Sequence, residues 1–483
     1  MMQITCKLHF SILAAAGLLA AQTPAAPIAN KDDFAPQTAD GYRGIWYMNQ
    51  PTADEYVYKY SGGFGTYPQQ HAPIAIYAPA VRKTFFVYGG SAGNVSVDKD
   101  ELQHMIGYYD HRSGTVPRPV RIVQKRTEDA HDNPTLSIDA EGYLYVFSSA
   151  HGTTRPSYIH RSRKPYDITA WDLLQTTNFS YTQPWYLPDS KQFLFLHTLY
   201  KNGERTLNFK TSPDARTWTE PTLLAHIQMG DYQISWRDSA TGRVGTAFDM
   251  HPSAGRAGKG LNYRTNLYYL ETRDAGKTWT NAAGRAVTLP LTTVQNAALV
   301  HDYLSEDRNV YVKDIAFQKD GKPVILFLTS KGFEPGPKSG PYEWQTARWT
   351  GRGWTIRPFT TSDHNYDHGS LFIESENDWR IMAPTDPGPQ PNATGGELVL
   401  WISGNQGKDW NRMGAITHNS YYNHTYLRKV LNANPEFYAI WADGNPLKPS
   451  ESALYFCTSD GRAFRLPQKM AGDLAEPVRV EFK

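Results

Sequence analysis

The sequence predicts an all-β fold, and more specifically a seven-bladed β-propeller. Three observations lead to this prediction: the composition of the chain, an opening pattern that precedes one strand after another, and a turn motif that closes several groups of strands. Apolar residues recur in short runs, while long helical periodicity is hard to find. The expected architecture is a ring of small antiparallel sheets, because closing the ring removes exposed sheet edges.

The composition favours strands over helices. Phe, Trp and Tyr make up 13% of the chain, which also contains 38 Gly residues. Aromatic and β-branched side chains suit a pleated, half-buried surface, and Gly suits the turns between strands. The formal net charge is only +2, so an anionic ligand would need a local cluster of positive charge. No basic patch interleaved with aromatic residues is present, and nucleic-acid binding is not expected.

A polar or aromatic cluster followed by a short apolar strand recurs at intervals that suit a propeller blade. Between openings the pattern reads strand, turn, strand, longer loop, strand, turn, strand. The openings occupy residues 69–77, 130–138, 180–187, 231–236, 312–317, 367–373 and 423–430. Each opening predicts the innermost strand of one blade, so their number predicts seven blades.

Turn motifs support the same division of the chain. SPDARTW (212–218) and RDAGKTW (273–279) follow the Asp-box pattern of sialidase-type propellers, and SGNQGKDW (403–410) is a looser copy. In such a turn Asp and Gly set the backbone, and Trp packs between blades. A pair of β-sandwiches is the alternative fold, but it would not need equivalent positions in every group.

The N-terminus predicts export. A single Lys, an apolar run at about residues 8–21 and then small residues are typical of a secretory signal peptide, which we place at residues 1–26. Residues 27–483 are expected to form one catalytic propeller domain. No later stretch approaches the ~20 apolar residues of a membrane-spanning helix. We therefore expect a secreted or periplasmic protein, monomeric and without a membrane partner. Cys6 would leave with the signal, and Cys457 would have no intrachain disulfide partner.

Propeller topology places two histidines on the same face. Loops that lead into first strands and loops that join second to third strands lie together at one mouth of the ring. His131 belongs to the first kind of loop and His151 to the second. The same reasoning brings to this mouth His71, Tyr181, Tyr200, Tyr232, His251, Lys313, His368 and His424, with the basic residues Arg205, Arg256, Lys259 and Arg264. Arg216 and Lys277, in the Asp boxes, fall on the opposite face.

These residue types suit an acidic carbohydrate. Arg binds carboxylate or sulfate bidentately, and Tyr can pack against sugar rings. Hydrolysis of a glycoside usually needs two carboxyl groups, whereas the blade openings offer only Asp231, Asp314 and Asp367, each beside an aromatic or basic residue. Elimination from a uronate needs a group that neutralises the carboxylate, a base and an acid. Arg, His and Tyr supply these three parts.

Several segments carry a family resemblance. They are GYRGIWYMNQ (41–50), KYSGGFGTYPQQHAPIAIY (59–77), HDNPTLSID (131–139), SSAHG (148–152), SYTQPW (180–185) and DYQIS (231–235). They resemble the BNR-repeat β-propeller polysaccharide lyases, and most closely the secreted ulvan lyases. The resemblance implies β-elimination at rhamnose–uronate linkages of a sulfated polysaccharide, which leaves 4,5-unsaturated uronate ends.

The resemblance also implies roles for residues. His131 would transfer a proton, and His151 would be its neighbour or would bind the uronate carboxylate. Tyr181 and Tyr200 both fit the family's Tyr, with Tyr232 as a third choice, and Arg205 fits its Arg, with Arg264 as a substitute. The expected substrate-binding residues are Asn133, Tyr232, His251 and Arg264.

Simpler interpretations remain open alongside this one. His131 can be a turn residue, the Tyr residues can fill space around the axis, and Arg205 can be a solvated loop charge. A sialidase-like glycoside hydrolase and a non-catalytic glycan-binding propeller are the alternative functions. The chemistry needs no cofactor. His251, His364, His368 and His424 show no short-spaced metal motif, although the resemblance leaves room for a structural Ca²⁺ or Zn²⁺ ion.

Overall fold

The computed structural model describes residues 31–64, 70–91, 102–201, 203–255 and 259–481. The predicted signal peptide and Arg256 lie outside these ranges. Within them the regular secondary structure is almost entirely β-strand, as predicted, and the helices are single 3₁₀ turns. These turns are η1 (Lys31–Phe34), η3 (Ala130–Asp132), η4 (Gly260–Asn262) and η5 (Pro337–Ser339). In the described ranges no helix has the length and apolar character needed to cross a bilayer.

Five antiparallel sheets of four strands each follow one another along the chain. The first contains β9 (Pro134–Ile138), β10 (Leu144–Ser148), β11 (Ser157–Ser162) and β12 (Trp171–Thr177). The second contains β13 (Ser180–Leu187), β14 (Gln192–Lys201), β15 (Glu204–Ser212) and β16 (Thr222–Ala225). The third contains β17 (Gln233–Arg237), β18 (Val244–Met250), β19 (Thr265–Thr272) and β20 (Leu299–His301). The fourth contains β21 (Asn309–Phe317), β22 (Pro323–Ser330), β23 (Tyr342–Trp349) and β24 (Trp354–Ser362). The fifth contains β25 (Ser370–Ser375), β26 (Asp378–Asp386), β27 (Glu397–Ser403) and β28 (Asn411–Ala415).

A ten-stranded sheet brings the two ends of the chain together. One half contains β4 (Ala75–Ala78), β5 (Lys83–Gly90), β6 (Gln103–Asp110) and β8 (Val120–Gln124), with β1 (Gln37–Thr38) at its edge. The other half contains β29 (Asn423–Asn434), β30 (Phe437–Gly444), β31 (Leu454–Cys457) and β32 (Ala463–Arg465), with β34 (Val478–Arg479) at its edge. The halves join where β29 pairs in parallel with β4, Leu431 opposite Ile76.

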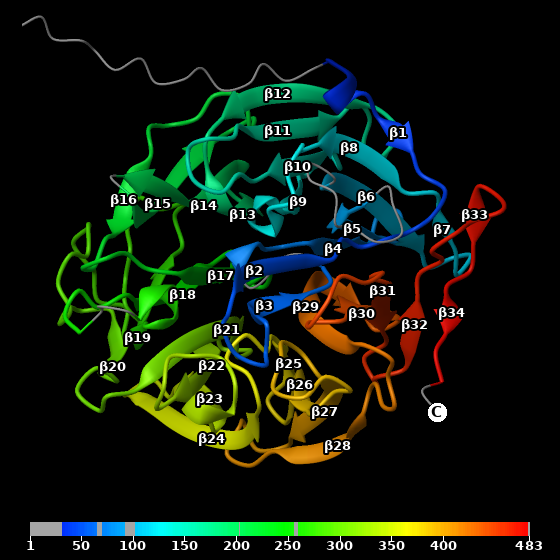
Figure 1. The fold of residues 1–483 in the computed structure, drawn as a ribbon. Helices are drawn as coiled ribbons and strands as arrows, with labels where there is room; N and C mark the ends of the chain where they lie inside the picture. Colours follow the sequence, from blue (N-terminus) through cyan, green and yellow to red (C-terminus); the bar gives the residue numbers. More distant parts are fainter. Residues whose placement is uncertain (1–30, 65–69, 92–101, 202, 256–258, 482–483) are drawn as a thin grey trace, which may run out of the picture.

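The first strands of these runs surround a common axis. β4, β9, β13, β17, β21, β25 and β29 contact one another in that order, and β29 returns to β4, so the sheets form a closed, propeller-like ring (Figure 1). Each opening predicted from the sequence overlaps one of these strands, and all lie at its start except residues 312–317, which form the second part of β21. Their inward side chains, such as Leu136, Trp185 and Ile234, are fully buried around the axis. Burial of each stabilises the fold by about 1.5–3 kcal/mol.

Two Asp-box turns have the predicted structure on the face opposite the candidate site. The turn after β15 is built on Asp214, whose Oδ1 accepts hydrogen bonds from the backbone N–H groups of Arg216 and Thr217, both at 2.8 Å. In the turn after β19, Trp279 packs on Phe209 of the preceding sheet, with ring centroids 5.3 Å apart. The Trp therefore fills the space between neighbouring sheets, as predicted.

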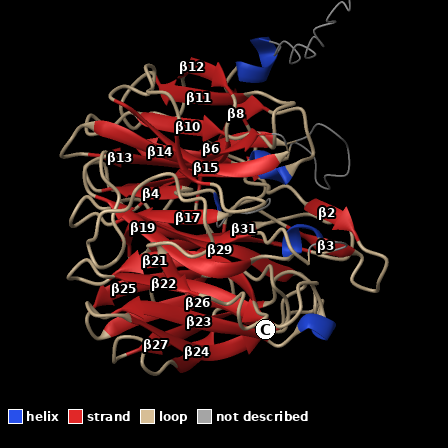
Figure 2. Ribbon diagram, turned by 90° about the vertical axis from the view of Figure 1, so that its left-hand side faces the viewer, coloured by secondary structure: helices blue, strands red, loops and turns tan. Residues whose placement is uncertain are grey.

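An N-terminal hairpin, residues 47–62, crosses one mouth of the ring. It consists of β2 (Tyr47–Pro51) and β3 (Tyr58–Gly62), lies over the axis in Figure 1 and projects from one end of the ring in Figure 2. The indole N–H of Trp46 donates to the backbone oxygen of Asn445 at 2.8 Å, and the Ser61 hydroxyl donates to that of Pro446. These hydrogen bonds to the loop after β30 hold the N-terminal hairpin across the mouth of the ring.

Both chain ends cross the seam between the first and last runs of strands. From the N-terminal side, Tyr42 N–H donates to the Pro467 oxygen at 2.8 Å, while β1 itself pairs with β8 of the first run. In the other direction β33 (Leu474–Ala475) pairs with β7 (Val116–Pro117). Met470 N–H donates to the Asp40 oxygen at 2.6 Å. These exchanged segments reinforce the parallel contact that closes the ring.

Candidate active site

The β9–β10 hairpin places His131 and His151 side by side. Ser148 at the end of β10 is opposite Pro134 at the start of β9, and each histidine lies three residues beyond that pair. The two imidazole rings stack with centroids 4.0 Å apart and an interplanar angle of 14°. The predicted meeting of the two histidines at one mouth of the ring is confirmed.

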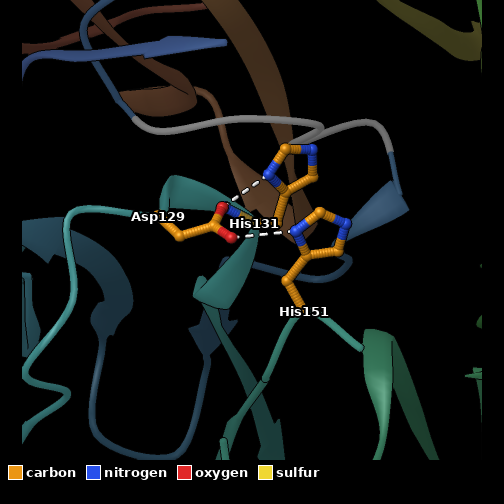
Figure 3. Close-up of side chains that lie close together, drawn as sticks. All are labelled: Asp129, His131 and His151. Atoms are coloured by element: carbon orange, nitrogen blue, oxygen red, sulfur yellow. Dashed lines mark hydrogen bonds and ion pairs between the residues drawn. The ribbon is translucent and has the colours of Figure 1, made fainter. Parts of the chain in front are cut away.

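Asp129 bridges the two imidazoles (Figure 3). Its Oδ1 is 2.6 Å from Nδ1 of His131, and its Oδ2 is 2.8 Å from Nδ1 of His151. Oδ1 also accepts the backbone N–H of His131, because Asp129 caps the 3₁₀ turn η3. Since an ionised carboxylate only accepts hydrogen bonds, both Nδ1 atoms carry the proton.

Charged neighbours hold Asp129 in place. The Arg155 guanidinium donates to Asp129 Oδ2 at 2.8 Å and to both oxygens of Asp132 at 2.9 Å. Lys125 Nζ lies 3.5 Å from Asp132 Oδ2. Asp132 is fully buried, so these cations compensate for the loss of its hydration. The bridging carboxylate is thus fixed before any ligand binds.

The environment separates the pKa values of this cluster. Burial, with a smaller effect from the nearby His151, lowers the pKa of His131 to about 4 although Asp129 acts to raise it. Burial raises the pKa of Asp129, but the charges and hydrogen bonds of His131 and His151 outweigh it and hold that pKa well below its ordinary value. His131 is therefore a neutral imidazole with a proton on Nδ1 and a lone pair on Nε2.

The N-terminal hairpin supplies the other contacts of His131. The Tyr60 hydroxyl lies 2.9 Å from Nε2 of His131, and Asn49 Nδ2 lies 3.4 Å from the same atom. Because Nε2 is an acceptor in this tautomer, Tyr60 donates. The side chain of His131 is 6% exposed and that of His151 is 34% exposed. His151 is thus the more open of the two.

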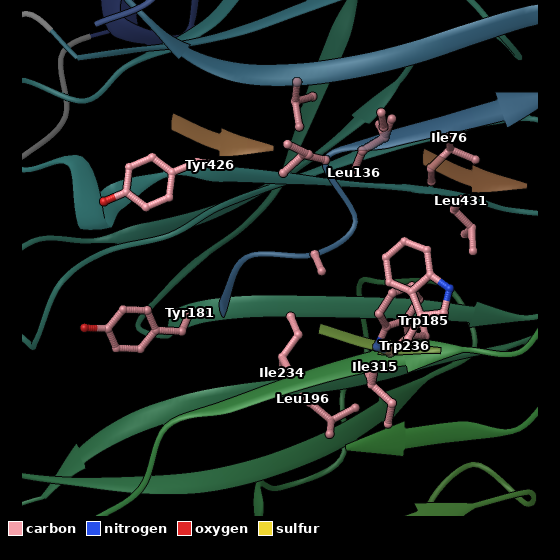
Figure 4. Packing of buried hydrophobic residues seen from close by; sticks show 14 of the residues in the cluster. Ile76, Leu136, Tyr181, Trp185, Leu196, Ile234, Trp236, Ile315, Tyr426 and Leu431 are labelled. Atoms are coloured by element: carbon pink, nitrogen blue, oxygen red, sulfur yellow. The ribbon is translucent and has the colours of Figure 1, made fainter. Parts of the chain in front are cut away.

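The predicted tyrosines lie against the histidines. The Tyr181 ring centroid is 6.1 Å from that of His131, and the Tyr200 centroid is 5.9 Å from that of His151. The Tyr200 hydroxyl donates to that of Tyr181 at 3.4 Å. Figure 4 shows Tyr181 at one end of the buried apolar cluster, with its hydroxyl pointing away from Leu196 and Ile234. The site therefore begins where the apolar packing of the axis ends.

Arg205, Tyr232 and Arg264 form the neighbouring part of the site. The guanidinium carbons of Arg205 and Arg264 lie 4.8 and 4.9 Å from the centroid of the Tyr232 ring. Arg264 also donates to the Tyr366 hydroxyl at 2.9 Å. The Tyr366 ring lies 4.4 Å from that of Tyr60, centroid to centroid, so this part adjoins His131. Asp249 lies 3.8 Å from Arg264, and burial raises the pKa of Asp249 to about 7.

The other two predicted binding residues lie deeper. His251 is fully buried, its ring packs 5.0 Å from that of Tyr232, and its Nδ1 lies 2.9 Å from the Gly230 backbone oxygen. Asn133 is 5% exposed, and its backbone oxygen accepts the N–H of Ser149 at 3.3 Å. Both residues support the site from beneath rather than lining its open side.

A cavity of about 460 Å³ lies between the N-terminal hairpin and the histidine pair. Its walls are Trp46, Tyr47, Met48, Asn49, Gln50, Tyr58, Glu128, Asp129, His131, His151 and Pro449. Aromatic rings facing polar groups suit a sugar, which presents apolar ring faces and polar hydroxyls.

Other histidines predicted at this mouth serve packing. The Trp441 indole donates to Nδ1 of His424, and the Ser420 hydroxyl lies 2.9 Å from its Nε2. His368 stacks on Tyr426, with centroids 4.7 Å apart, and lies 3.3 Å from Lys313 Nζ. His364 Nδ1 accepts the N–H of Tyr366 at 3.1 Å.

Among the described residues, one group of side chains of the kinds that bind metal ions lies close together. The ligand atoms of Asp129, His131 and His151 all lie within 4.8 Å of one another. The hydrogen bonds from both Nδ1 atoms to Asp129 satisfy these groups without a cation. The arrangement therefore suits proton transfer at least as well as it suits a metal.

Sequence reasoning missed Asp129, Arg155, Asn49 and Tyr60. Asp129 carried a signal, since an Asp two residues before His131 can cap a turn. Tyr60 and Asn49 lie about 70–80 residues from His131 along the chain, and no local pattern connects them with it.

The family described as "BNR repeat-containing family member" matches residues 95–362, more than half of the chain. The ulvan lyase of Alteromonas sp. (strain LOR) is 24% identical over 358 residues, which cover 65% of this chain and 69% of that enzyme. The ulvan lyase of Nonlabens ulvanivorans is 24% identical over 353 residues, 66% of this chain and 72% of that enzyme. The "Ulvan Lyase-PL25" of Pseudoalteromonas sp. (strain PLSV) is 25% identical over 288 residues, and this chain spans only 58% of its length.

Solved structures share the fold. A structure described as a PL25 ulvan lyase superposes with a TM-score of 0.66 at 17% identity and covers 87% of this chain and 96% of its own. A second structure of that kind, bound to -[GlcA(1-4)Rha3S]-, gives a TM-score of 0.67 at 16% identity, with the same coverage. The propeller-like architecture is thus shared along nearly the whole length of those chains.

Proposed function

We propose that this chain, which belongs to the BNR repeat-containing family, is a polysaccharide lyase that cleaves a sulfated rhamnose–uronate polysaccharide of the ulvan type by β-elimination. The ulvan lyases among its relatives support this assignment. We further propose that the ring has seven blades, with the ten-stranded sheet counted as two blades joined through β4 and β29. The five separate sheets and the two four-strand halves of that sheet support this number.

The Asp129-bridged histidine pair is the observation that carries the proposal. Two stacked imidazoles share one carboxylate, and two Tyr residues and Arg205 lie beside them. A lectin needs no such proton-transfer assembly. A glycosidase needs two available carboxyl groups, whereas Asp129 is bonded to two histidines and an arginine.

The proposed elimination begins at the uronate C5–H bond. His131 accepts the C5 proton on Nε2, the C–H electron pair forms the C4=C5 double bond, and the C4–O bond breaks. Tyr200, with Tyr181 beside it, gives a proton to the departing oxygen. His131 then returns its proton to solvent and Tyr200 takes one from solvent, which restores both groups. Tyr60 holds the Nε2 lone pair in the free protein, so the sugar must displace the Tyr60 hydroxyl.

Arg205 and His151 are proposed to neutralise the uronate carboxylate. Neutralisation makes the C5 proton acidic, because the carbanion formed at C5 spreads its charge into the carboxyl group. His151 is open to the cavity, and the hydrogen bond between its Nδ1 and Asp129 fixes the orientation of its ring.

The direct test incubates the purified protein with ulvan and follows the ultraviolet absorbance of unsaturated uronate together with product masses. We expect unsaturated oligosaccharides from the wild-type protein. H131A and H151A should each lower turnover about 100-fold or more without unfolding the protein. H301A is the control, because His301 lies on β20, the edge strand of its sheet, and pairs with the exposed Glu306. New reducing ends without the absorbance would identify a hydrolase, and binding without any product would identify a lectin.

Export and monomeric state are further parts of the proposal. The charge, apolar run and small residues of positions 1–26 support cleavage of a signal peptide. Mass spectrometry of the protein recovered from the medium or periplasm should give a mature N-terminus near residue 27, and light scattering should give the mass of one chain.

A further inference from the structure

Lys59 is buried, and no described residue supplies it with a counter-ion. It lies on β3 of the N-terminal hairpin and is 6% exposed. Its Nζ lies 5.9 Å from the ring centroid of Tyr60 and 5.8 Å from that of Tyr366. Within the described ranges, no carboxylate or hydrogen-bond acceptor contacts this ammonium group. Burying such a group is costly unless a partner arrives.

The charged groups that act most strongly on Lys59 are cations. Arg264 lies on the same Tyr366 ring, with its guanidinium carbon 5.5 Å from the centroid, and Arg205 joins Arg264 on Tyr232. Burial, together with the charges of Arg264 and Arg205, lowers the pKa of Lys59 to about 7. The nearby Asp249 cannot compensate fully, since burial keeps that carboxyl partly protonated near pH 7.

Lys59 adjoins the proton-transfer pair. Its neighbour Tyr60 touches Nε2 of His131, and Tyr366 connects Tyr60 with Arg264. A negative group held among the three cations would therefore lie beside His131. Lys and Arg together bind an oxyanion through charge-assisted hydrogen bonds, which are the strong ones in proteins.

We propose that Lys59, Arg205 and Arg264 form an oxyanion-binding site for an acidic group of the polysaccharide, a uronate carboxylate or a sulfate ester, and that Lys59 contacts this group directly. This inference rests on the proposed function for the identity of the ligand, an acidic polysaccharide, but does not require that the protein cleaves it. The N-terminal hairpin then becomes part of the binding site, because it carries the third cation.

Anion binding should change the protonation of Lys59. In the free protein a fraction of Lys59 is neutral at pH 8, and an oxyanion favours the charged form. Binding of an acid at pH 8 should therefore draw a proton from the buffer. Calorimetry in two buffers of different ionisation enthalpy measures that uptake without any turnover.

The experiment titrates glucuronate, rhamnose 3-sulfate and neutral rhamnose into wild-type, K59M, K59R and K210M proteins at pH 8. K210M is the matched control: Lys210 is 7% exposed, lies 4.9 Å from the centroid of the Trp218 ring and has its pKa lowered by burial to about 8, but it lies towards the opposite face. We expect K59M to bind the preferred acid about tenfold more weakly and without proton uptake. K59R should keep the affinity and lose the uptake, and K210M should match wild type.

Equal affinity and equal proton uptake in wild-type and K59M proteins would overturn the inference, provided that both melt cooperatively. Desulfated and carboxyl-reduced ulvan then show which acid occupies the site, because only removal of the bound group should abolish the difference between wild-type and K59M KM values. If wild-type protein gives no unsaturated product from any ulvan but K59M still weakens acid binding, the lyase proposal fails and the oxyanion site stands.

Discussion

At the scale of single residues, one carboxylate organises the site. Asp129 caps the turn that carries His131 and accepts a hydrogen bond from each of two imidazoles. A neighbouring arginine fixes its position. The tautomer of both rings and their parallel stacking therefore depend on Asp129.

The first prediction concerns this bridge. D129N keeps the shape of the side chain but presents an amide that can accept through only one atom, so one imidazole loses its partner. We expect kcat to fall about 100-fold or more, with little change in far-ultraviolet circular dichroism. D139N is the control, because Asp139 bonds Tyr143 N–H and Tyr145 in the turn at the other end of the same strands. Equal activity of D129N and wild type would remove Asp129 from the mechanism.

The second prediction concerns pH. The pKa of His131 is lowered to about 4, mainly by burial, so the ring stays neutral and able to accept a proton at any pH above that value. The acid limb of kcat/KM should therefore lie near pH 4–5 rather than near the ordinary histidine value of about 6.5. In D129N the residual activity should have a limb at still lower pH, since Asp129 raises the pKa of His131. An acid limb near 6.5 in the wild-type profile would assign the base to another group.

The site residues predicted from the sequence were those whose positions follow from strand pairing within one hairpin. His131 and His151 lie at matched distances from the two ends of one hairpin, so strand pairing alone brings them together. Tyr60 and Arg155 were not predicted as site residues, because their contacts depend on how an N-terminal segment and a loop fold over that hairpin. A pairing pattern within one sheet does not contain this information.

At the scale of elements, the N-terminal hairpin combines support and function. It brings Asn49, Lys59 and Tyr60 to the site and packs Tyr47 on Tyr426 of β29, with centroids 5.8 Å apart. The repeat predicted the first strand of every run but not this hairpin, because the hairpin lies before the first opening and has no equivalent in the other groups.

The third prediction is that Lys59, on the N-terminal hairpin, lowers the free energy of unfolding. The pKa of Lys59 falls from 10.5 unfolded to about 7 folded, so the folded state is destabilised fully below pH 7 and not at all above about pH 10.5. At ~1.4 kcal/mol per pKa unit, K59M should be more stable than wild type by up to a few kcal/mol at pH 6. Denaturant titrations at pH 6 and pH 10 measure this difference. An advantage of the same size at both pH values would show that packing, not charge, is its source.

The fourth prediction concerns an Asp box. Asp274 accepts hydrogen bonds from the N–H of Thr278 at 2.9 Å and from the hydroxyls of Thr272 and Thr278 at 2.9 and 2.7 Å. D274A should cost about 1–3 kcal/mol of folding free energy, measured by urea unfolding. Its kcat and KM should match wild type, because this turn lies on the face away from the histidines. A kinetic change at unchanged stability would mean that the two faces communicate.

At the scale of the whole molecule, closure of the ring depends on the chain ends. β29 and β4 share a single described register pair, and the pairing of β33 with β7 and the hydrogen bonds of Tyr42 and Met470 add further contacts across the seam. The sequence predicted a closed ring from the repeat but not how the ring closes, because these short segments have no strand periodicity of their own.

The fifth prediction tests the seam. A chain ending at Gln468 loses the buried Met470, β33 and β34, and with them the hydrogen bond from Met470 to Asp40. We expect the free energy of unfolding to drop by about 3 kcal/mol or more, because each buried side chain contributes about 1.5–3 kcal/mol. A chain ending at Glu481 keeps both strands and should melt like the full chain. Identical melting of the two truncated chains would show that β4 and β29 hold the ring unaided.

The docking of the N-terminal hairpin on the last sheet also sets the order in which the protein can become competent. The residues that touch His131 from the hairpin are made early, but Asn445 and Pro446, which anchor that hairpin, are made near the end of synthesis. A chain that ends before residue 445 thus contains the histidine pair but lacks the anchor of the N-terminal hairpin. The hairpin can therefore take its observed place over His131 only once residues 445 and 446 have been made.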